Sequence, residues 1–259
     1  MIKKLLVVGD VHIKPDISNE RLTKLGRLVV DLKPDVIVQI GDMADMPSLS
    51  MFDVGKKSFE GKRYSKDIAA VHDGLKKFQS PIDEYNKELA TKKLKKYNPK
   101  KYICMGNHER RIERAVNSDP KLDGTMGLED LQYEEFGWET VPFLEPLVIE
   151  GVVFQHYYTS GAFERAMSGE NLGNGILKKY HTSAFAGHNH LLQLAWQSDA
   201  NGKRLMAGSI GCYFDHEEEY FSRQTQNNFW RGVILLRGVD NGSIEDYETI
   251  SLSRIKREY

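Results

Sequence analysis

The chain has 259 residues, of which 40% are hydrophobic and 10% aromatic, so it has enough apolar material for a sizeable core. Its 36 basic and 37 acidic residues give a formal net charge of -1, which excludes a globally basic nucleic-acid coat and an acidic disordered tail but leaves a local basic face open. A mean hydropathy of -0.50 and the lack of a long apolar run exclude a transmembrane helix.

The amino terminus carries a short apolar run, Leu5 to Val8, that leads directly into Asp10 and His12. Because no small-residue cleavage site follows this run, we expect a buried parallel strand rather than a signal peptide, and a protein that stays in the cytoplasm. The two cysteines, Cys104 and Cys212, are too few for a disulfide framework, which also favours a reducing compartment.

Strand and helix then alternate. Residues 18–32 predict a helix with Ser18 or Asn19 as its N-cap, and residues 34–42 predict a second buried strand, so that the first three elements form a right-handed βαβ unit. Residues 51–100 are highly charged and predict a helical insert. Its lysines at 92, 93, 95 and 96 are expected on a solvated helix face, and the alternative is a basic patch that meets a phosphate backbone.

A third strand is expected at residues 101–105, and short β-type runs dominate from Leu147 to the end of the chain. Asn201-Gly202 and Asn241-Gly242 are strong signals for hairpin turns between these runs. We expect this half of the chain to form much of a second sheet.

Histidines gather at the ends of the predicted strands. Five of the eight histidines follow an apolar strand, together with two aspartates and an asparagine: His12, His108, His156, His188, His190, Asp10, Asp42 and Asn107. A single histidine at a strand end is more often an ordinary hydrogen-bonded residue. Ligands of open α/β sheets bind at the carboxyl ends of the strands, however, so this repeated pattern predicts one shared site.

The order of these motifs resembles the calcineurin-like metallophosphoesterases. The motifs are Gly9-Asp10-Val11-His12, Gly41-Asp42-Met43-Ala44-Asp45, Gly106-Asn107-His108-Glu109, His156 and Gly187-His188-Asn189-His190. The resemblance implies an α/β fold, a four-layer αββα sandwich of two mixed β-sheets flanked by helices. It also implies a single domain over residues 1–259, with the helical insert at about 51–100.

The resemblance further implies two divalent metal ions that share one bridging carboxylate. The implied ligands are Asp42 as the bridge, Asp10, His12 and His190 at one ion, and Asn107, His156 and His188 at the other. Imidazole and carboxylate ligands suit manganese, which we expect first, or iron, zinc, cobalt or nickel, rather than calcium or magnesium.

The implied reaction is the hydrolysis of a phosphate ester by in-line attack of a hydroxide that bridges the two metals. His108 is the expected general acid for the leaving oxygen, and Asp45 is expected to orient it. The alternative role for Asp45 is a helix N-cap. Arg111 is expected either to grip the phosphate or to be an ordinary surface charge.

Two departures from the family pattern bear on the substrate. Met46-Pro47 stands where protein phosphatases of the family carry an arginine-glycine pair, and Tyr157 and Tyr158 follow the strand-end histidine, where they either stack on a base or sugar or simply pack. With the basic insert, these features favour a phosphodiesterase acting on nucleic acid or a nucleotide. The alternatives are a phosphomonoesterase for phosphoproteins or small metabolites and, third, a non-catalytic metal-binding scaffold.

The remaining histidines, His72, His181 and His216, are expected at the surface, although the segment that leads to His216 follows a strand end and could fold near the metals.

Overall fold

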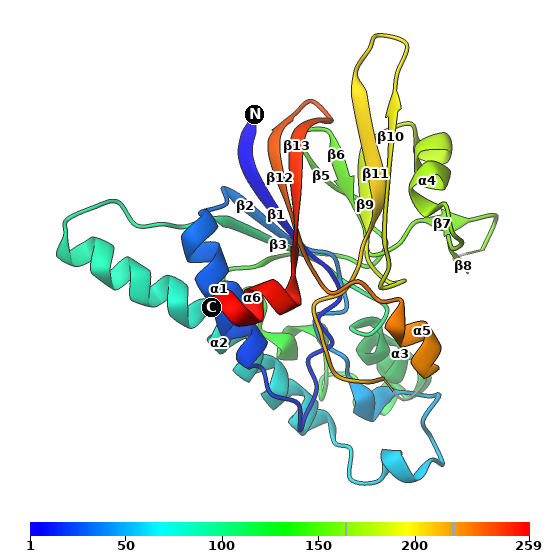
Figure 1. Ribbon diagram of the computed structural model, residues 1–259. Helices are drawn as coiled ribbons and strands as arrows, with labels where there is room; N and C mark the ends of the chain where they lie inside the picture. Colours follow the sequence, from blue (N-terminus) through cyan, green and yellow to red (C-terminus); the bar gives the residue numbers. More distant parts are fainter. Residues whose placement is uncertain (164, 219–220) are drawn as a thin grey trace.

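The computed structural model describes residues 1–163, 165–218 and 221–259 (Figure 1). Two β-sheets contain most of its strands. The first sheet contains β1 (Ile2–Val8), β2 (Val36–Gln39), β3 (Lys100–Cys104), β4 (Glu139–Val141), β12 (Gly232–Asp240) and β13 (Ser243–Ser251). The second contains β5 (Leu147–Ile149), β6 (Val152–Phe154), β9 (Ala184–Ala186), β10 (Leu192–Ser198) and β11 (Arg204–Ile210), and a separate small hairpin pairs β7 (Thr159–Ser160) with β8 (Arg165–Ala166).

The helices lie outside the sheets. They are α1 (Glu20–Leu32), α2 (Tyr64–Thr91), α3 (Arg110–Ser118), α4 (Leu172–Tyr180), α5 (Arg223–Asn227) and α6 (Leu252–Glu258), with short 3-10 turns η1 (Pro47–Leu49), η2 (Lys57–Phe59), η3 (Pro120–Leu122) and η4 (Leu128–Leu131). None of the helices in the described ranges combines the length and apolarity needed to cross a membrane.

The central strand β1 shows why the layers pack as they do. Its side chains alternate, so that Leu5 and Val7 enter the core between the two sheets while Leu6 and Val8 enter the core beneath α1 and α2. A strand that is apolar on both faces requires cover on both. On the far side, α4 packs Leu172 and Ile176 against the outer face of the second sheet. The order is therefore helices, sheet, sheet and helix, and the expected four-layer α/β sandwich is confirmed.

The strand order of the first sheet is β13-β12-β1-β2-β3-β4, and that of the second is β10-β11-β9-β6-β5. The parallel pairing of β1 with β2 confirms the predicted βαβ unit. The chain after Leu147 supplies the whole second sheet, but its last two strands return to the first sheet, because β12 pairs antiparallel with β1. Both Asn-Gly pairs lie in hairpin turns, as predicted, and Asn241 and Gly242 adopt φ values of 45° and 78°.

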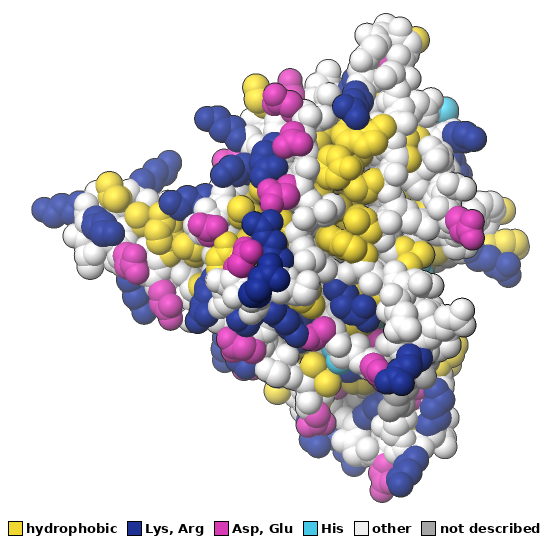
Figure 2. Space-filling model, viewed as in Figure 1, with side chains coloured by type: hydrophobic (Ala, Val, Ile, Leu, Met, Phe, Trp, Pro, Cys, Tyr) yellow, Lys and Arg dark blue, Asp and Glu magenta, His cyan; other side chains and the backbone are white. Residues whose placement is uncertain are grey.

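Along one edge of the sandwich, β13 of the first sheet lies next to β11 and β10 of the second. Hydrophobic side chains gather in this region in the space-filling view (Figure 2). Trp196 of β10 and Tyr247 of β13 lie there with their ring centroids 5.7 Å apart, and the guanidinium of Arg204 lies 4.0 Å from the ring centroid of Trp196. The inter-sheet core therefore extends to the surface along this edge.

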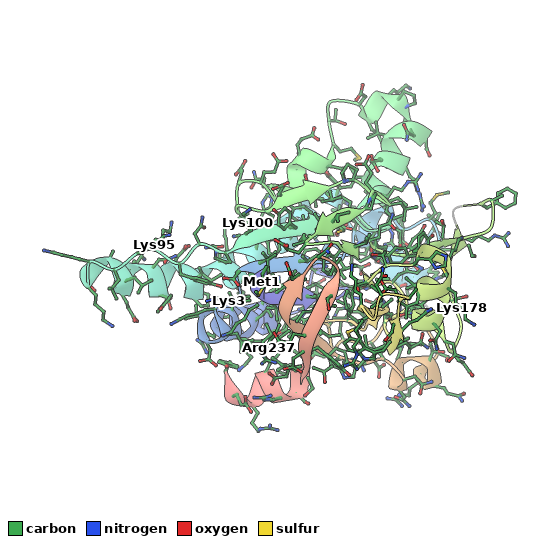
Figure 3. All side chains as sticks on the ribbon, turned by 90° about the horizontal axis from the view of Figure 1, so that it is seen from above. Met1, Lys3, Lys95, Lys100, Lys178 and Arg237 are labelled. Atoms are coloured by element: carbon green, nitrogen blue, oxygen red, sulfur yellow. The ribbon has the colours of Figure 1, made fainter. Side chains whose placement is uncertain are left out.

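The insert is dominated by one long helix, α2, which buries Ile82 and Leu89. Lys93 adopts a φ of 55° just after the helix, and a left-handed residue cannot continue it. Lys92 to Lys96 are exposed, as predicted, but the expectation that they lie on a helix face is wrong, because α2 ends at Thr91. Lys95 lies on the projecting arm, in the segment that returns after the end of α2 (Figure 3).

Asp67, in the first turn of α2, is a buried carboxylate that is only 1% exposed. The backbone N–H of Ser48 donates to its Oδ2 at 2.9 Å. Burial raises the pKa of Asp67 to about 6, against the opposing effect of hydrogen bonds from Ser48. Because this value lies above the ordinary 3.8, the folded protein holds the proton more tightly, and its stability falls as the pH rises from about 4 to about 6.

We expect Asp67→Asn to remove the loss of stability that ionisation of the buried carboxyl group causes. The amide oxygen still accepts the hydrogen bond from the Ser48 N–H. The free energy of unfolding, measured by denaturant titration, should exceed that of the wild type by about 1–2 kcal/mol at pH 8, and the gain should vanish at pH 4. Glu88→Gln, on the exposed side of the same helix, is the control and should be neutral at both pH values. A gain of equal size at pH 4 and pH 8 would contradict the role of ionisation.

Candidate metal centre

The predicted site residues come together at the carboxyl ends of five strands, below the two sheets in the view of Figure 1. Each strand supplies its residues directly after it ends: β1 supplies Asp10 and His12, β2 supplies Asp42 and Asp45, β3 supplies Asn107 and His108, β6 supplies His156, and β9 supplies His188 and His190. The shared edge follows from the parallel pairing of β1, β2 and β3 in one sheet and of β6 and β9 in the other.

Asp10, His12 and His190 form the first cluster, with potential ligand atoms all within 4.8 Å of one another. The Nε2 of His190 lies 3.0 Å from Asp10 Oδ2, and all three side chains are at most 2% exposed. Within the described part of the chain, the buried Nε2 of His12 has no hydrogen-bond partner. The cluster therefore contains a buried imidazole nitrogen that could bind a metal and that no hydrogen bond of the cluster satisfies.

Asp42, His156 and His188 form the second cluster, again with potential ligand atoms within 4.8 Å. His156 Nδ1 lies 2.8 Å from the Ile40 carbonyl, to which it must donate. Its Nε2 lies 3.2 Å from Asp42 Oδ2 and 2.9 Å from Asn107 Oδ1. A neutral imidazole would direct its Nε2 lone pair at two oxygen atoms, so this position requires a positive charge, which a proton or a metal cation can supply.

Asp42 lies between the two clusters. Its Oδ2 is 3.7 Å from His12 Nε2 and 3.2 Å from His156 Nε2, while its Oδ1 accepts the backbone N–H of His108 at 2.9 Å. Burial raises the pKa of Asp42, but the imidazoles of His108 and His156 lower it more, to well below the usual range. The ionised carboxylate therefore lies between the two clusters, near an imidazole nitrogen of each.

The pKa shifts of the histidines show that the two clusters contain both carboxylate anions and neutral imidazoles. Burial lowers the pKa of His12, but the carboxylates of Asp42 and Glu218 raise it to about 10. Burial lowers the pKa of His188 to about 4, with the repulsion of His156 as the next cause. Anionic oxygens and imidazole nitrogens thus alternate in a buried space, and this donor set fits two divalent cations.

His108 takes a different position. Its Nδ1 lies 2.8 Å from Asp45 Oδ1, and its Nε2 lies 3.8 Å from Asp42 Oδ2. Burial raises the pKa of Asp45, but the hydrogen bond with His108 lowers it more, to about 2. The N-cap alternative for Asp45 is wrong, because Met46 is the N-cap of the following 3-10 turn, η1.

Arg111 packs over this pair from α3. Its Nη1 donates to the Asp45 carbonyl at 2.8 Å, its Nη2 lies 3.3 Å from His108 Nε2, and its side chain is only 12% exposed. The alternative of an ordinary surface charge is therefore wrong. The neighbouring Arg110 lies over the ring of Phe143, 4.7 Å from its centroid.

Glu109 holds the second and third ligand loops together. Its buried carboxylate accepts the backbone N–H groups of Asp42, Ala44 and Gly106 at 3.1, 2.8 and 2.9 Å. The hydroxyl of Tyr133 donates to it at 3.2 Å. A Cβ atom at Gly106 would overlap the Asp42 carboxylate, so glycine is required for this close approach.

Glu218 belongs to none of the motifs, but it is 2% exposed and lies 3.0 Å from His12 Nδ1. The expected surface position of His216 is wrong, because its side chain is 7% exposed and its Nε2 lies 2.8 Å from Glu218. A sequence signal for both residues was present, because they follow the end of strand β11 in the same way that the ligand loops follow the ends of their strands. His181 is exposed, as predicted, while His72 is half-buried against the Asp130 carbonyl.

Tyr157 and Tyr158 pack rather than face a substrate. Tyr158 is 3% exposed, and its hydroxyl donates to the Val153 carbonyl. Tyr157 is 9% exposed and packs on His188, with ring centroids 4.8 Å apart. The packing alternative is thus the correct one for both tyrosines.

A cavity of about 450 Å³ adjoins the site at Asp45 and Arg111. Its remaining walls come chiefly from the segment between η1 and α2, including Lys62 and Arg63, and from the first turn of α2, including Lys66. The insert therefore forms a wall of the space next to the two clusters.

Comparison with known proteins agrees with the motifs. The sequence model of the family described as calcineurin-like phosphoesterase matches residues 3–218. The chain is 24% identical over 244 residues to the Gene 54 protein of Mycobacterium phage L5, covering 91% of this chain and 89% of that protein. It is 22% identical over 254 residues to the Gene 54 protein of Mycobacterium phage D29, covering 95% of this chain and 92% of that protein.

Among solved structures, the chain is similar to Yfce, a phosphoesterase from E. coli, with 12% identity, a TM-score of 0.37 and coverage of 96% of this chain and 100% of that one. It is also similar to the protein TT1561 of Thermus thermophilus, with 10% identity, a TM-score of 0.35 and coverage of 97% of this chain and 100% of that one.

Proposed function

Because the chain belongs to the calcineurin-like phosphoesterase family and is thus a phosphoester hydrolase, we propose that it cleaves a phosphodiester of a nucleic acid or a nucleotide. The observation that carries the proposal is the buried arrangement of two ligand clusters around Asp42, with His108 beside them. The proposed place of action is the cytoplasm, and the two free, buried cysteines, Cys104 and Cys212, agree with a reducing compartment.

We expect the two clusters to hold one divalent cation each. The proposed ligands are Asp10, His12, His190 and the shared Asp42 for one cation, and Asn107, His156, His188 and the same Asp42 for the other. When bound, such a pair lowers the pKa of water and neutralises charge on the phosphoryl group. Manganese is the first candidate, and iron, zinc, cobalt and nickel suit the same nitrogen and oxygen donors.

His108 is the proposed general acid. Asp45 fixes its Nδ1 at 2.8 Å, which directs Nε2 toward the space beside Asp42. The carboxylate of Asp45 stabilises the imidazolium, from which the Nε2 proton passes to the leaving oxygen. Arg111 Nη2 lies 3.3 Å from that nitrogen, to which it can donate only while Nε2 is unprotonated, so in the imidazolium form its N–H is released to contact a phosphate oxygen nearby.

The surroundings of Asp45 favour a diester over a monoester. A monoester phosphate carries up to two negative charges and needs more cationic contacts than a diester with one. Met46 and Pro47 are buried where protein phosphatases of the family carry an arginine-glycine pair. Lys14 is already paired with Glu218 at 2.8 Å. The cavity beside Asp45 offers room for a nucleoside, and its wall carries both basic and acidic side chains, so it presents no strongly cationic surface to a phosphate dianion.

Hydrolysis of bis-p-nitrophenyl phosphate and of p-nitrophenyl phosphate, measured with added Mn²⁺ and with EDTA, tests the proposal. We expect a higher kcat/KM for the diester, loss of activity in EDTA and its return with Mn²⁺. A preference for the monoester would overturn the diesterase assignment, and a lack of metal-dependent activity on both would overturn the proposed function. Single-stranded DNA, RNA and cyclic nucleotides are the substrates to compare next.

His108→Asn tests the assignment of the general acid. We expect kcat for the diester to fall by about 100- to 10,000-fold while metal content, measured by inductively coupled plasma mass spectrometry, stays at the wild-type level. His188→Ala is the comparison and should lose metal. If His108→Asn loses as much metal as His188→Ala does, His108 is a ligand and not the acid.

A further inference from the structure

Glu218 follows all of the motifs in the sequence, but its side chain is buried beside His12, which belongs to the first motif. After β11 the chain folds back over the site, and the Glu218 Oε1 reaches His12 Nδ1 at 3.0 Å. The two residues are 206 positions apart in the sequence, and each is at most 2% exposed.

The Glu218 carboxylate is held firmly in this place. Its Oε1 also lies 2.8 Å from His216 Nε2, and its Oε2 accepts from Lys14 Nζ at 2.8 Å. The backbone N–H of Glu218 donates to Gln226 Oε1 at 2.9 Å, and Gln226 Nε2 donates back to the Glu218 carbonyl at 3.0 Å. Both the side chain and the backbone of this residue are therefore fixed.

The contact determines how the His12 ring is oriented. A carboxylate can only accept, so His12 Nδ1 must carry the hydrogen, and in a neutral ring the lone pair then lies on Nε2. That nitrogen is buried and faces Asp42 Oδ2 at 3.7 Å. The ring of Phe214 stacks on His12 with centroids 4.7 Å apart and an angle of 16° between the planes, which restrains the ring further.

Glu218 is not itself placed as a metal ligand, although its carboxylate, that of Asp45 and a nitrogen of His12 lie within 4.8 Å of one another. The ammonium of Lys14 lies 2.8 Å from Glu218 and 3.6 Å from Asp45, so it supplies the positive charge between these two carboxylates. This lysine also links Glu218 to the carboxylate that orients His108.

We propose that Glu218 is a positioning residue that fixes His12 with Nε2 directed at the first cation site. The inference rests on the proposed function, because it assigns His12 to a metal. A carboxylate on the second nitrogen of a ligand histidine sets its tautomer and raises its basicity, and removal of such a partner lowers metal affinity about 10- to 100-fold.

The test is calorimetric titration of the chelated protein with Mn²⁺. We expect Glu218→Ala to weaken one of the two binding steps about 10- to 100-fold and to leave the other within a few-fold of the wild type. Glu218→Gln keeps an oxygen acceptor for the Nδ1 hydrogen and should lose less. Glu217→Gln changes an exposed neighbour whose side chain is 75% exposed, and it should bind as the wild type does.

Activity on the diester gives a second readout. The Glu218→Ala defect should be largest at low Mn²⁺ and should shrink at saturating Mn²⁺, which a general loss of structure would not produce. Wild-type affinity for both Mn²⁺ ions in Glu218→Ala, or an equal loss in Glu217→Gln, would overturn the inference. If Glu218→Ala does not fold, Glu218→Asp, which withdraws the carboxylate by one methylene, takes its place with the same expected loss of affinity.

The two proposals fail separately. A wild-type protein without metal-dependent hydrolysis would overturn the proposed function, while the titrations would still decide whether Glu218 supports metal binding at His12.

Discussion

The carboxylate of Asp42 is the group on which the rest of the site depends. It is 1% exposed and lies 3.7 Å from His12, 3.8 Å from His108 and 3.2 Å from His156. A buried carboxylate costs several kcal/mol unless positive charge compensates it, and three imidazoles alone cannot all be neutral around it. The strands therefore deliver to one point a buried anion that needs positive charge beside it, which protonated imidazoles or divalent cations can supply.

Two charged side chains outside the site hold its loops in place. Glu109 accepts from the backbone of the Asp42 loop and of the Gly106 loop. Arg21, which is 3% exposed, donates to the Val11 carbonyl at 2.9 Å and to the Tyr213 carbonyl at 3.3 Å, so it joins the first ligand loop to the segment that carries Glu218. Burial lowers the pKa of Arg21 to about 10. The ligand loops are thus held by buried charged side chains that hydrogen-bond to their backbone.

Features set by local sequence could be predicted, and those set by distant partners could not. Apolar strands followed by Asp, Asn or His were enough to predict that nine site residues lie at one edge of the sheets. The two Asn-Gly pairs were enough to predict two hairpin turns. Asn19 lies at the N-cap of α1, as predicted, but its side chain does not cap the helix: the amide donates to the Ala70 carbonyl and to Asp73, because α2 packs there. Glu218 was missed for the same reason, since its partner is His12, 206 residues earlier, although the segment with His216 was expected near the metals as an alternative to the surface.

The most direct test of the account is anomalous diffraction from crystals grown with Mn²⁺. We expect two anomalous peaks that share Asp42, one bounded by Asp10, His12 and His190 and the other by Asn107, His156 and His188. With Asp42→Asn, both peaks should weaken. A single peak, or two peaks of which neither contacts Asp42, would contradict the claim that this buried carboxylate organises a two-metal centre.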